Sequence, residues 1–206
     1  AFGNVLGADR KILKSRSGEV VKLDALLTES VERAADAVKE KNAELPAAQQ
    51  AEVARQIGIG AVKYADLSTD RIKDYVFDWE RMLAFEGNTS PYLQYAHARI
   101  CSIFRRTGVD RAAVRGITPT LGHSAERALT VRLLQFDTAV WDTLDKYSPH
   151  RLCTYLYELA SEFSSFYEHC PILRADSEEQ KMSRLALWDF TARVMEQGLA
   201  VLGIES

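Results

Sequence analysis

Several features that would place this chain in a common class of proteins are missing from its 206 residues. No run of about 18 apolar residues occurs, so no segment is predicted to cross a membrane. The opening stretch "AFGNVLGADRK" has no basic segment followed by an apolar one, which argues against a secretory signal. It resembles the interior of a domain, and we therefore expect a fragment of a longer protein. Internal repeats and low-complexity tracts are also missing, which excludes a solenoid.

Cysteine is scarce, and its spacing carries no motif. Cys101, Cys153 and Cys170 are odd in number and form no C-x-x-C or Cys/His pattern. A disulfide framework or a zinc site is therefore not expected, and a reducing cytoplasm fits best. We predict that the three thiols pack as small apolar groups.

Basic residues are not in excess either. Lys and Arg number 26 against 29 Asp and Glu, for a net charge of −3. Nucleic-acid-binding proteins usually carry a surplus of basic residues. Any RNA contact must then depend on a local patch rather than on overall charge.

What the sequence does contain is helical periodicity. Apolar residues recur at intervals of three and four over nearly everything after residue 22, which predicts a mainly all-α fold. Two glycines, Gly58 and Gly60, interrupt a helical pattern, and we interpret them as points of close approach to another backbone. The expected helices cover 22–42, 47–67, 70–86, 91–106, about 125–146, a segment restarting at "SPH", and a final helix capped by Ser177.

The first 25 or so residues differ from this pattern. The short apolar runs "FGNVL" and "RKILK" flank "GAD" and predict a small β-hairpin, followed by a polar loop. Strands never alternate with helices, so no complete nucleotide-binding sheet is expected. The sequence thus predicts a β-hairpin and loop followed by a helical bundle.

Two segments could be phosphate-binding loops. "KMSR" at Lys181 matches part of a synthetase signature, but it lies inside the final helix, where Met182 and Leu185 fit the core and Lys181 and Arg184 a solvated face. "KILKSRSG" lies in non-helical context and supplies two cations and two hydroxyl groups within residues 14–17. A mobile loop suits phosphate chemistry better than a helix does. From spacing alone, this second segment is equally consistent with a charged turn.

The helix at 91–106 has two different faces. Leu93, Ala96, Ile100 and Ile103 form a core stripe. A parallel stripe carries aromatic and guanidinium groups, which suit an unstacked base and its phosphate. Without further information, tyrosines at this spacing are more often half-buried core residues. The stripe consists of Tyr92, Tyr95, Arg99, Ser102 and Arg106.

Several segments resemble arginyl-tRNA synthetases, and together they span nearly the whole chain. They are "VLGADRKILKSRSGEVVKLDALL", "IGAVKYADLSTDRIKDYVFDW", "GNTSPYLQYAHARICSIFRR", "LYELASEFSSFYEHCPIL" and "SRLALWDFTARVMEQGLAVLGIE". The resemblance implies ATP-dependent attachment of arginine to its tRNA. It identifies "KMSR" as a chance match, because the closing helix of the family belongs to the anticodon-binding domain.

The resemblance also assigns roles to residues. Lys14, Ser15 and Arg16 match the catalytic signature loop, and Lys14, Arg16, Ser17 and Gly18 match its ATP-binding part. The pattern departs from K-M-S-K-S, so Arg16 or a lysine elsewhere takes the role of the second lysine. Tyr92 and Tyr95 correspond to anticodon-binding positions of the family, and Arg99 and Arg106 are expected to contact phosphate. Tyr64 is expected to face the tRNA stem or the catalytic domain.

The expected organisation follows from the same resemblance. Residues 1–27 would be the signature-loop edge of the catalytic domain, 28–86 a helical junction touching the tRNA stem, and 87–206 an α-helical anticodon-binding domain. No His-x-Gly-His motif is present, so this chain alone is predicted to be inactive and to need no cofactor. ATP with magnesium, arginine and the arginine tRNA would be partners of the full-length enzyme, a cytoplasmic monomer. Two rivals are a helical bundle that docks a protein without binding RNA, and a standalone ATP-binding enzyme using Lys181.

Overall fold

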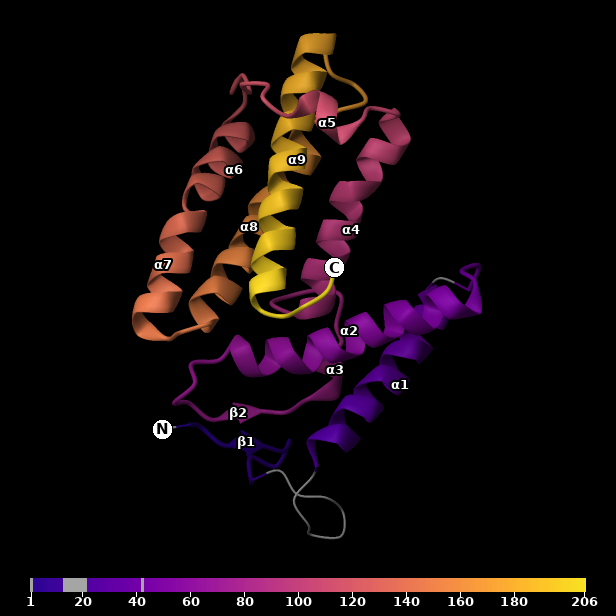
Figure 1. Cartoon of the computed structure of the whole chain (residues 1–206), viewed down its shortest axis with the longest axis vertical. Coiled ribbons are helices and arrows are strands. Elements are labelled where there is room, and N and C mark those ends of the chain that lie inside the picture. The colour runs from indigo at the N-terminus through magenta and orange to yellow at the C-terminus, as the bar shows by residue number, and fades with distance from the viewer. Residues whose placement is uncertain (1, 13–21, 42) are drawn as a thin grey trace.

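Two groups of helices lie at an angle to each other in the computed structural model, which describes residues 2–12, 22–41 and 43–206 (Figure 1). The N-terminal group consists of β1 (Val5–Leu6), α1 (Leu23–Lys41), α2 (Ala47–Leu67), β2 (Tyr75–Val76) and α3 (Trp79–Met82). The C-terminal group consists of α4 (Ser90–Thr107), α5 (Arg111–Val114), α6 (Ser124–Leu134), α7 (Phe136–Lys146), α8 (His150–His169) and α9 (Glu178–Val201). The predicted mainly all-α fold is confirmed.

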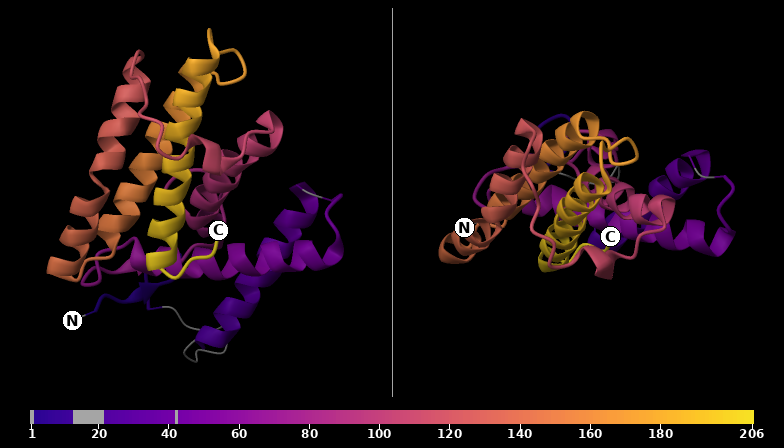
Figure 2. Two further views of the ribbon diagram at one scale, coloured as in Figure 1. Left: turned by 45° about the horizontal axis from the view of Figure 1, so that its top comes forward. Right: turned by 90° about the horizontal axis from the view of Figure 1, so that it is seen from above.

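The C-terminal group is a bundle with one continuous apolar core. The predicted core stripe of α4 is buried throughout, and so are the leucines and phenylalanines that α8 turns inward. Trp188 of α9 lies in the centre, with its ring centroid 4.8 Å from that of Phe163 in an edge-on contact. Buried Cys153 and Cys170 and half-buried Cys101 are free thiols, as predicted. Figure 2 shows the bundle helices standing on α2, with α1 and α2 extending to one side.

Close contacts on either side of α2 join the two groups. A Cβ built on Gly58 would lie 2.7 Å from Val31 Cα in α1, and the Ser30 hydroxyl donates to the Gly58 carbonyl at 2.8 Å. A Cβ on Gly60 would lie 2.7 Å from Ser90 Oγ at the start of α4. The predicted close approach of another backbone is confirmed at Gly58, where the neighbour is the backbone of α1. At Gly60 that prediction is wrong, because the near atoms belong to the side chains of Ser90 and Gln94.

Of the helix predicted over 70–86, Trp79–Met82 is helical, as α3, and the remainder of the prediction is wrong. Tyr75 and Val76 instead form β2, which pairs in parallel with β1, and Ile72, expected in the core, is 61% exposed. The Tyr75 and Phe77 N–H groups donate to the carbonyls of Asn4 and Leu6. A strand distant in sequence thus captures this segment, and this long-range pairing overrides the local helical period.

The predicted N-terminal hairpin is largely replaced by the same pairing. One antiparallel bridge, Leu6 to Ile12, is what the described residues retain of it, and the ladder of β1 runs to β2. The rest of the second predicted strand, Leu13 and Lys14, lies outside the described residues.

The long helix predicted from 125 to 146 is divided at Gln135 into α6 and α7. The Tyr155 hydroxyl and the Gln135 N–H both donate to the Arg132 carbonyl. The Arg132 carbonyl thus accepts hydrogen bonds that are not part of the regular helical pattern, and this accounts for the break between α6 and α7.

Replacing Gly58 by Ala should destabilise the fold. The added methyl group would force α1 and α2 apart at a cost of about 1–3 kcal/mol, offset by about 1 kcal/mol of helix propensity. We expect a net loss of up to about 2 kcal/mol in the free energy of unfolding, measured by urea titration with circular dichroism. Gly122→Ala is the control, because the nearest atom to a methyl group at that position would be a Glu126 carboxylate oxygen at 3.8 Å, an ordinary contact. Equal losses in both variants would contradict the close approach.

Candidate nucleic-acid interface

α4 presents one side to solvent because its other side is locked into the core. The Thr89 hydroxyl accepts from the Tyr92 N–H at 3.2 Å, Pro91 lies in the first turn, and Gly108 ends the helix in the left-handed conformation at φ 67°. These signals set the helix bounds. The buried stripe then determines which residues face outward.

The predicted tyrosine and arginine residues lie along this outward side. Tyr95 is 53% exposed, and Arg99 and Arg106 are exposed as well. Tyr92 is half-buried against α8, with its ring edge-on to Tyr157 at 5.9 Å between centroids. The structure therefore brings all four together along one border of α4 and α8, with Tyr95 as the freest aromatic surface.

Tyr167 of α8 completes this surface, and the sequence analysis missed it. The Arg99 guanidinium lies over the Tyr167 ring, 4.0 Å from its centroid. Hydrogen bonding and charge from Arg99, with a smaller effect of Arg106, hold the pKa of Tyr167 below its usual range. The sequence offered one signal: Tyr167 follows core residue Phe166 directly, so it is turned about 100° from the core.

Tyr64 does not face a partner, contrary to expectation. It is buried, and its hydroxyl lies 2.6 Å from Asn88 Oδ1 and 3.0 Å from the Cys153 carbonyl. Burial raises the pKa of this phenol strongly. Its role is structural: it connects α2, the segment before α4, and α8.

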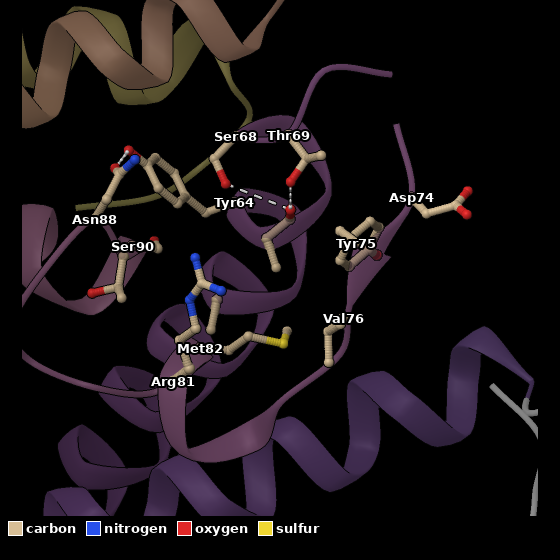
Figure 3. A pocket seen from close by; sticks show the side chains of 13 residues that line it. Tyr64, Ser68, Thr69, Asp74, Tyr75, Val76, Arg81, Met82, Asn88 and Ser90 are labelled. Carbon is tan, nitrogen blue, oxygen red and sulfur yellow. Dashed lines mark hydrogen bonds between the residues drawn. The ribbon is translucent and has the colours of Figure 1, made fainter. Parts of the chain in front are cut away.

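Beside Tyr64, a hollow of about 290 Å³ opens between α2, β2, α3 and α4 (Figure 3). Ser68 and Thr69 line one side of it, Ser90 another, and Arg81 reaches toward it from α3. The two hydroxyl groups at 68 and 69 bond to the Ala65 carbonyl. They therefore close the end of α2 rather than point freely into the hollow.

The two candidate signature loops have different outcomes. Residues Lys14, Ser15, Arg16, Ser17 and Gly18 lie outside the described residues, so their proposed role remains a prediction. "KMSR" is in α9, as expected, where Lys181 Nζ lies 3.1 Å from Glu178. It is helical backbone and cannot act as a mobile loop.

The expectation of a solvated Arg184 is wrong. Arg184 is buried, its Nε donates to Glu126 at 2.9 Å, and Nη1 donates to the Pro171 carbonyl at 3.0 Å. Glu126 is also buried and accepts from the His123 N–H at 2.8 Å. The ion pair explains how a charge enters the core: its partner lies 58 residues away in sequence, so helical periodicity could not reveal it.

Neither a metal cluster nor a membrane span is found in the described parts of the chain. Over those residues, no group of three or more His, Cys, Asp or Glu side chains is placed to hold an ion. The described helices include none that is long and apolar enough to cross a bilayer.

Comparison with known proteins matches the N-terminal and C-terminal parts of the chain to two protein families. Residues 93–206 match the family described as "DALR anticodon binding domain", and residues 1–79 match "tRNA synthetases class I (R), catalytic domain". Among curated relatives, arginine–tRNA ligase of Erwinia tasmaniensis is 52% identical over 205 residues, covering 100% of this chain and 35% of that protein. That of Enterobacter sp. strain 638 is 50% identical and is covered to 36%.

Solved structures give the same result. Arginyl-tRNA synthetase of Thermus thermophilus matches with a TM-score of 0.86 and 34% identity, and that of Plasmodium falciparum with 0.82 and 30%. Each match covers 100% of this chain and 34% of the other. The matches define the class, a class I synthetase with a DALR domain.

The chain belongs to the arginyl-tRNA synthetase family. It spans about a third of the length of the relatives that it matches.

Arg184→Met should destabilise the protein while Lys181→Ala leaves it nearly unchanged. Removing Arg184 leaves the buried Glu126 carboxylate without its partner, which should lower the free energy of unfolding by about 3–5 kcal/mol. A solvated pair such as Lys181–Glu178 contributes less than about 1 kcal/mol. Chemical unfolding measures both. Adding Glu126→Gln to Arg184→Met should recover part of the loss, since the two residues share one interaction. A Lys181→Ala variant that loses ATP binding would instead support the rival nucleotide site.

Acid should weaken the fold partly through Glu126. Burial by itself would raise the pKa of this carboxyl, but the His123 N–H and the Arg184 guanidinium bring it below the ordinary value of 4.5. The folded state then binds fewer protons than the unfolded one, so this contribution is full above pH 4.5 and is lost as pH falls through the folded pKa. Unfolding free energies measured down from pH 6 should fall less steeply for Glu126→Gln than for the natural chain. Parallel curves would contradict this assignment.

Proposed function

We propose that this chain acts within an enzyme that attaches arginine to its tRNA using ATP, and that residues 87–206 bind the anticodon loop. The outward side of α4, within the part that matches the anticodon-binding family, carries this proposal. Bases of an anticodon loop are single-stranded, and specific RNA recognition is directed mostly at such bases.

The chemistry of the surface fits a splayed base and its phosphate. Tyr95 offers an exposed ring for stacking, which is worth about 1–3 kcal/mol per base. Arg99 is held over Tyr167, so its guanidinium is ordered before any ligand arrives, and less entropy is lost on binding. Tyr92 contributes the edge of a second ring, and Arg106 a further charge.

The remaining predicted roles belong to the same proposal. Residues 1–27 would supply the signature loop, in which Lys14, Ser15 and Arg16 are the catalytic residues. Lys14, Arg16, Ser17 and Gly18 would bind ATP with its magnesium ion. Residues 28–86 would join this edge to the anticodon domain and lie along the tRNA stem. The catalytic-domain match ends at residue 79 and the anticodon-domain match begins at residue 93, which supports a boundary near residue 87. The boundary proposed at residue 27 lies inside the catalytic-domain match.

Equilibrium binding to an arginine tRNA tests the proposal. At one low salt concentration, the chain should prefer the natural tRNA over the same tRNA with its second anticodon base changed. Tyr95→Ala should weaken binding of the natural tRNA by about 1–3 kcal/mol, because one stacked base is lost. Tyr95→Phe keeps the ring and should stay close to the natural chain.

The controls separate this function from its rival. Trp141→Ala removes another exposed aromatic residue, 70% exposed on α7, and should leave RNA binding unchanged. If the natural chain shows no anticodon preference and Tyr95→Ala has no effect on RNA, the α4 surface does not bind the anticodon. That result would favour a bundle that docks a protein.

A further inference from the structure

One buried carboxylate of α9 gathers an unusual amount of positive charge. Asp189 is 1% exposed; its Oδ1 accepts from Arg111 Nε at 2.7 Å and its Oδ2 from Arg193 Nε at 2.8 Å. Arg115 Nε lies 3.9 Å from Oδ2. We call Asp189, Arg111, Arg115 and Arg193 the Asp189 cluster. The cluster therefore contains three positive charges and one negative charge.

The free ends of these arginines are directed to solvent. Arg115 and Arg193 side chains are 58% and 46% exposed, and that of Arg111 is 30% exposed. Asp189 uses the Nε atom in each case, and the residues that the structure describes offer no hydrogen-bond acceptor to the terminal amino groups. A planar guanidinium with free terminal N–H groups binds phosphate with two parallel hydrogen bonds.

The Asp189 cluster borders the outward side of α4. Arg111 lies over the ring of Phe104 in the last turns of α4, at 5.8 Å. Arg105, exposed in the last turn of α4, adds a further cation, and both Arg105 and Arg111 act electrostatically on Cys101 one turn earlier. Each residue turns α4 by about 100°, so Arg105 lies about 100° around the helix from Arg106, on the edge that carries Cys101 one turn earlier. Positive charge therefore lies on both edges of the outward side of α4: Arg99 and Arg106 beside α8, and Arg105 beside the Asp189 cluster of α5 and α9, which lie next to α4 (Figure 1).

Counter-charges near the cluster do not cancel it. The other carboxylate that acts on Arg111 is Glu196, one side chain on exposed α9 surface. Together with Asp189 and with Asp110, the exposed residue that caps α5 just before Arg111, it opposes four arginines and leaves a surplus of one positive charge. These arginines are Arg105, Arg111, Arg115 and Arg193. The protein as a whole has a net charge of −3, so this local surplus runs against the overall balance. Local surplus of this kind attracts a polyanion.

We propose that the Asp189 cluster binds phosphates of the RNA backbone next to the bases held on α4. This inference rests on the proposed function and extends its surface to α5 and α9. Asp189 is a positioning residue: it orients the guanidinium groups and does not touch RNA. Phosphate contacts add affinity without reading sequence, so the cluster should set salt dependence and not anticodon choice.

The test is a salt titration of tRNA binding with paired variants. Arg115→Gln/Arg193→Gln removes two exposed charges but keeps Arg111, which has the shortest bond to Asp189 and packs on Phe104. The slope of log Kd against log salt between about 50 and 200 mM should fall by about 0.7 for each lost single-strand contact. The ratio of Kd values for natural and altered anticodons should not change. Arg115→Lys/Arg193→Lys keeps the charge and should keep most of the slope.

The control and the contrary outcomes separate this inference from the proposed function. Arg151→Gln removes an arginine of α8 whose Nη1 lies 3.4 Å from Asp142 of α7, far from α5, and should leave the slope unchanged. An unchanged slope in the glutamine pair, with anticodon preference intact in the natural chain, overturns the cluster and leaves the proposed function standing. A lysine pair that loses as much slope as the glutamine pair also overturns it. A reduced slope in a chain without anticodon preference supports the cluster and overturns the proposed anticodon recognition.

Discussion

The position of α4 depends on one buried hydroxyl group. Tyr64 is anchored in α2, and its oxygen binds Asn88 just before α4 and the Cys153 carbonyl in α8. Gly60 brings the same helix against Ser90 within the first turn of α4. Inside the core, an unpaired polar group would cost about 1–3 kcal/mol, so this geometry is tightly constrained. The start of α4 is thereby held at a defined place and angle against both groups of helices.

A helix held this way can present a rigid outer surface. The backbone that carries Tyr95 and Arg99 is fixed because Leu93 and Ile100 on the opposite side are fully buried, and Tyr167 additionally holds the Arg99 side chain. Recognition groups on a regular helix supported by a packed core are positioned more precisely than groups on a loop. The tyrosine and arginine side chains can therefore remain exposed, at no cost to the core, where a ligand would meet them.

Charge is handled in two different ways on α9. Arg184 and Glu126 form a nearly closed pair in which each neutralises the other inside the core. Asp189, by contrast, holds three guanidinium groups whose outer ends stay in solvent. The first arrangement joins α9 to α6, and the second leaves charge available. Both carboxylates are buried, so the difference lies in the exposure of the arginine side chains. A buried arginine such as Arg184 has a structural role, whereas exposed arginines can bind an anion.

Local pattern was sufficient for much of the architecture. The bounds and core stripe of α4, the inward residues of α8 and the helical setting of "KMSR" follow from apolar spacing and capping residues, which act within a few residues. The close backbone approach at Gly58 could also be predicted, because a glycine within a helix costs about 1 kcal/mol unless another backbone requires it. At Gly60 the close contact is with side chains of α4 instead. Local pattern failed at residues 70–86, where β1 captured Tyr75 and Val76.

The fold class, the outward side of α4 and the resemblance to arginyl-tRNA synthetases could all be derived from the amino-acid chain. Four features emerge from the packing of the helices: Tyr64 is an internal link, Arg184 is buried, Tyr167 supports Arg99, and three arginines meet at Asp189. Helical periodicity reports which side of a helix is apolar, but not which distant residue that side meets. Buried ion pairs and shared carboxylates are contacts between segments far apart in the chain, so they appear only when the helices are packed together.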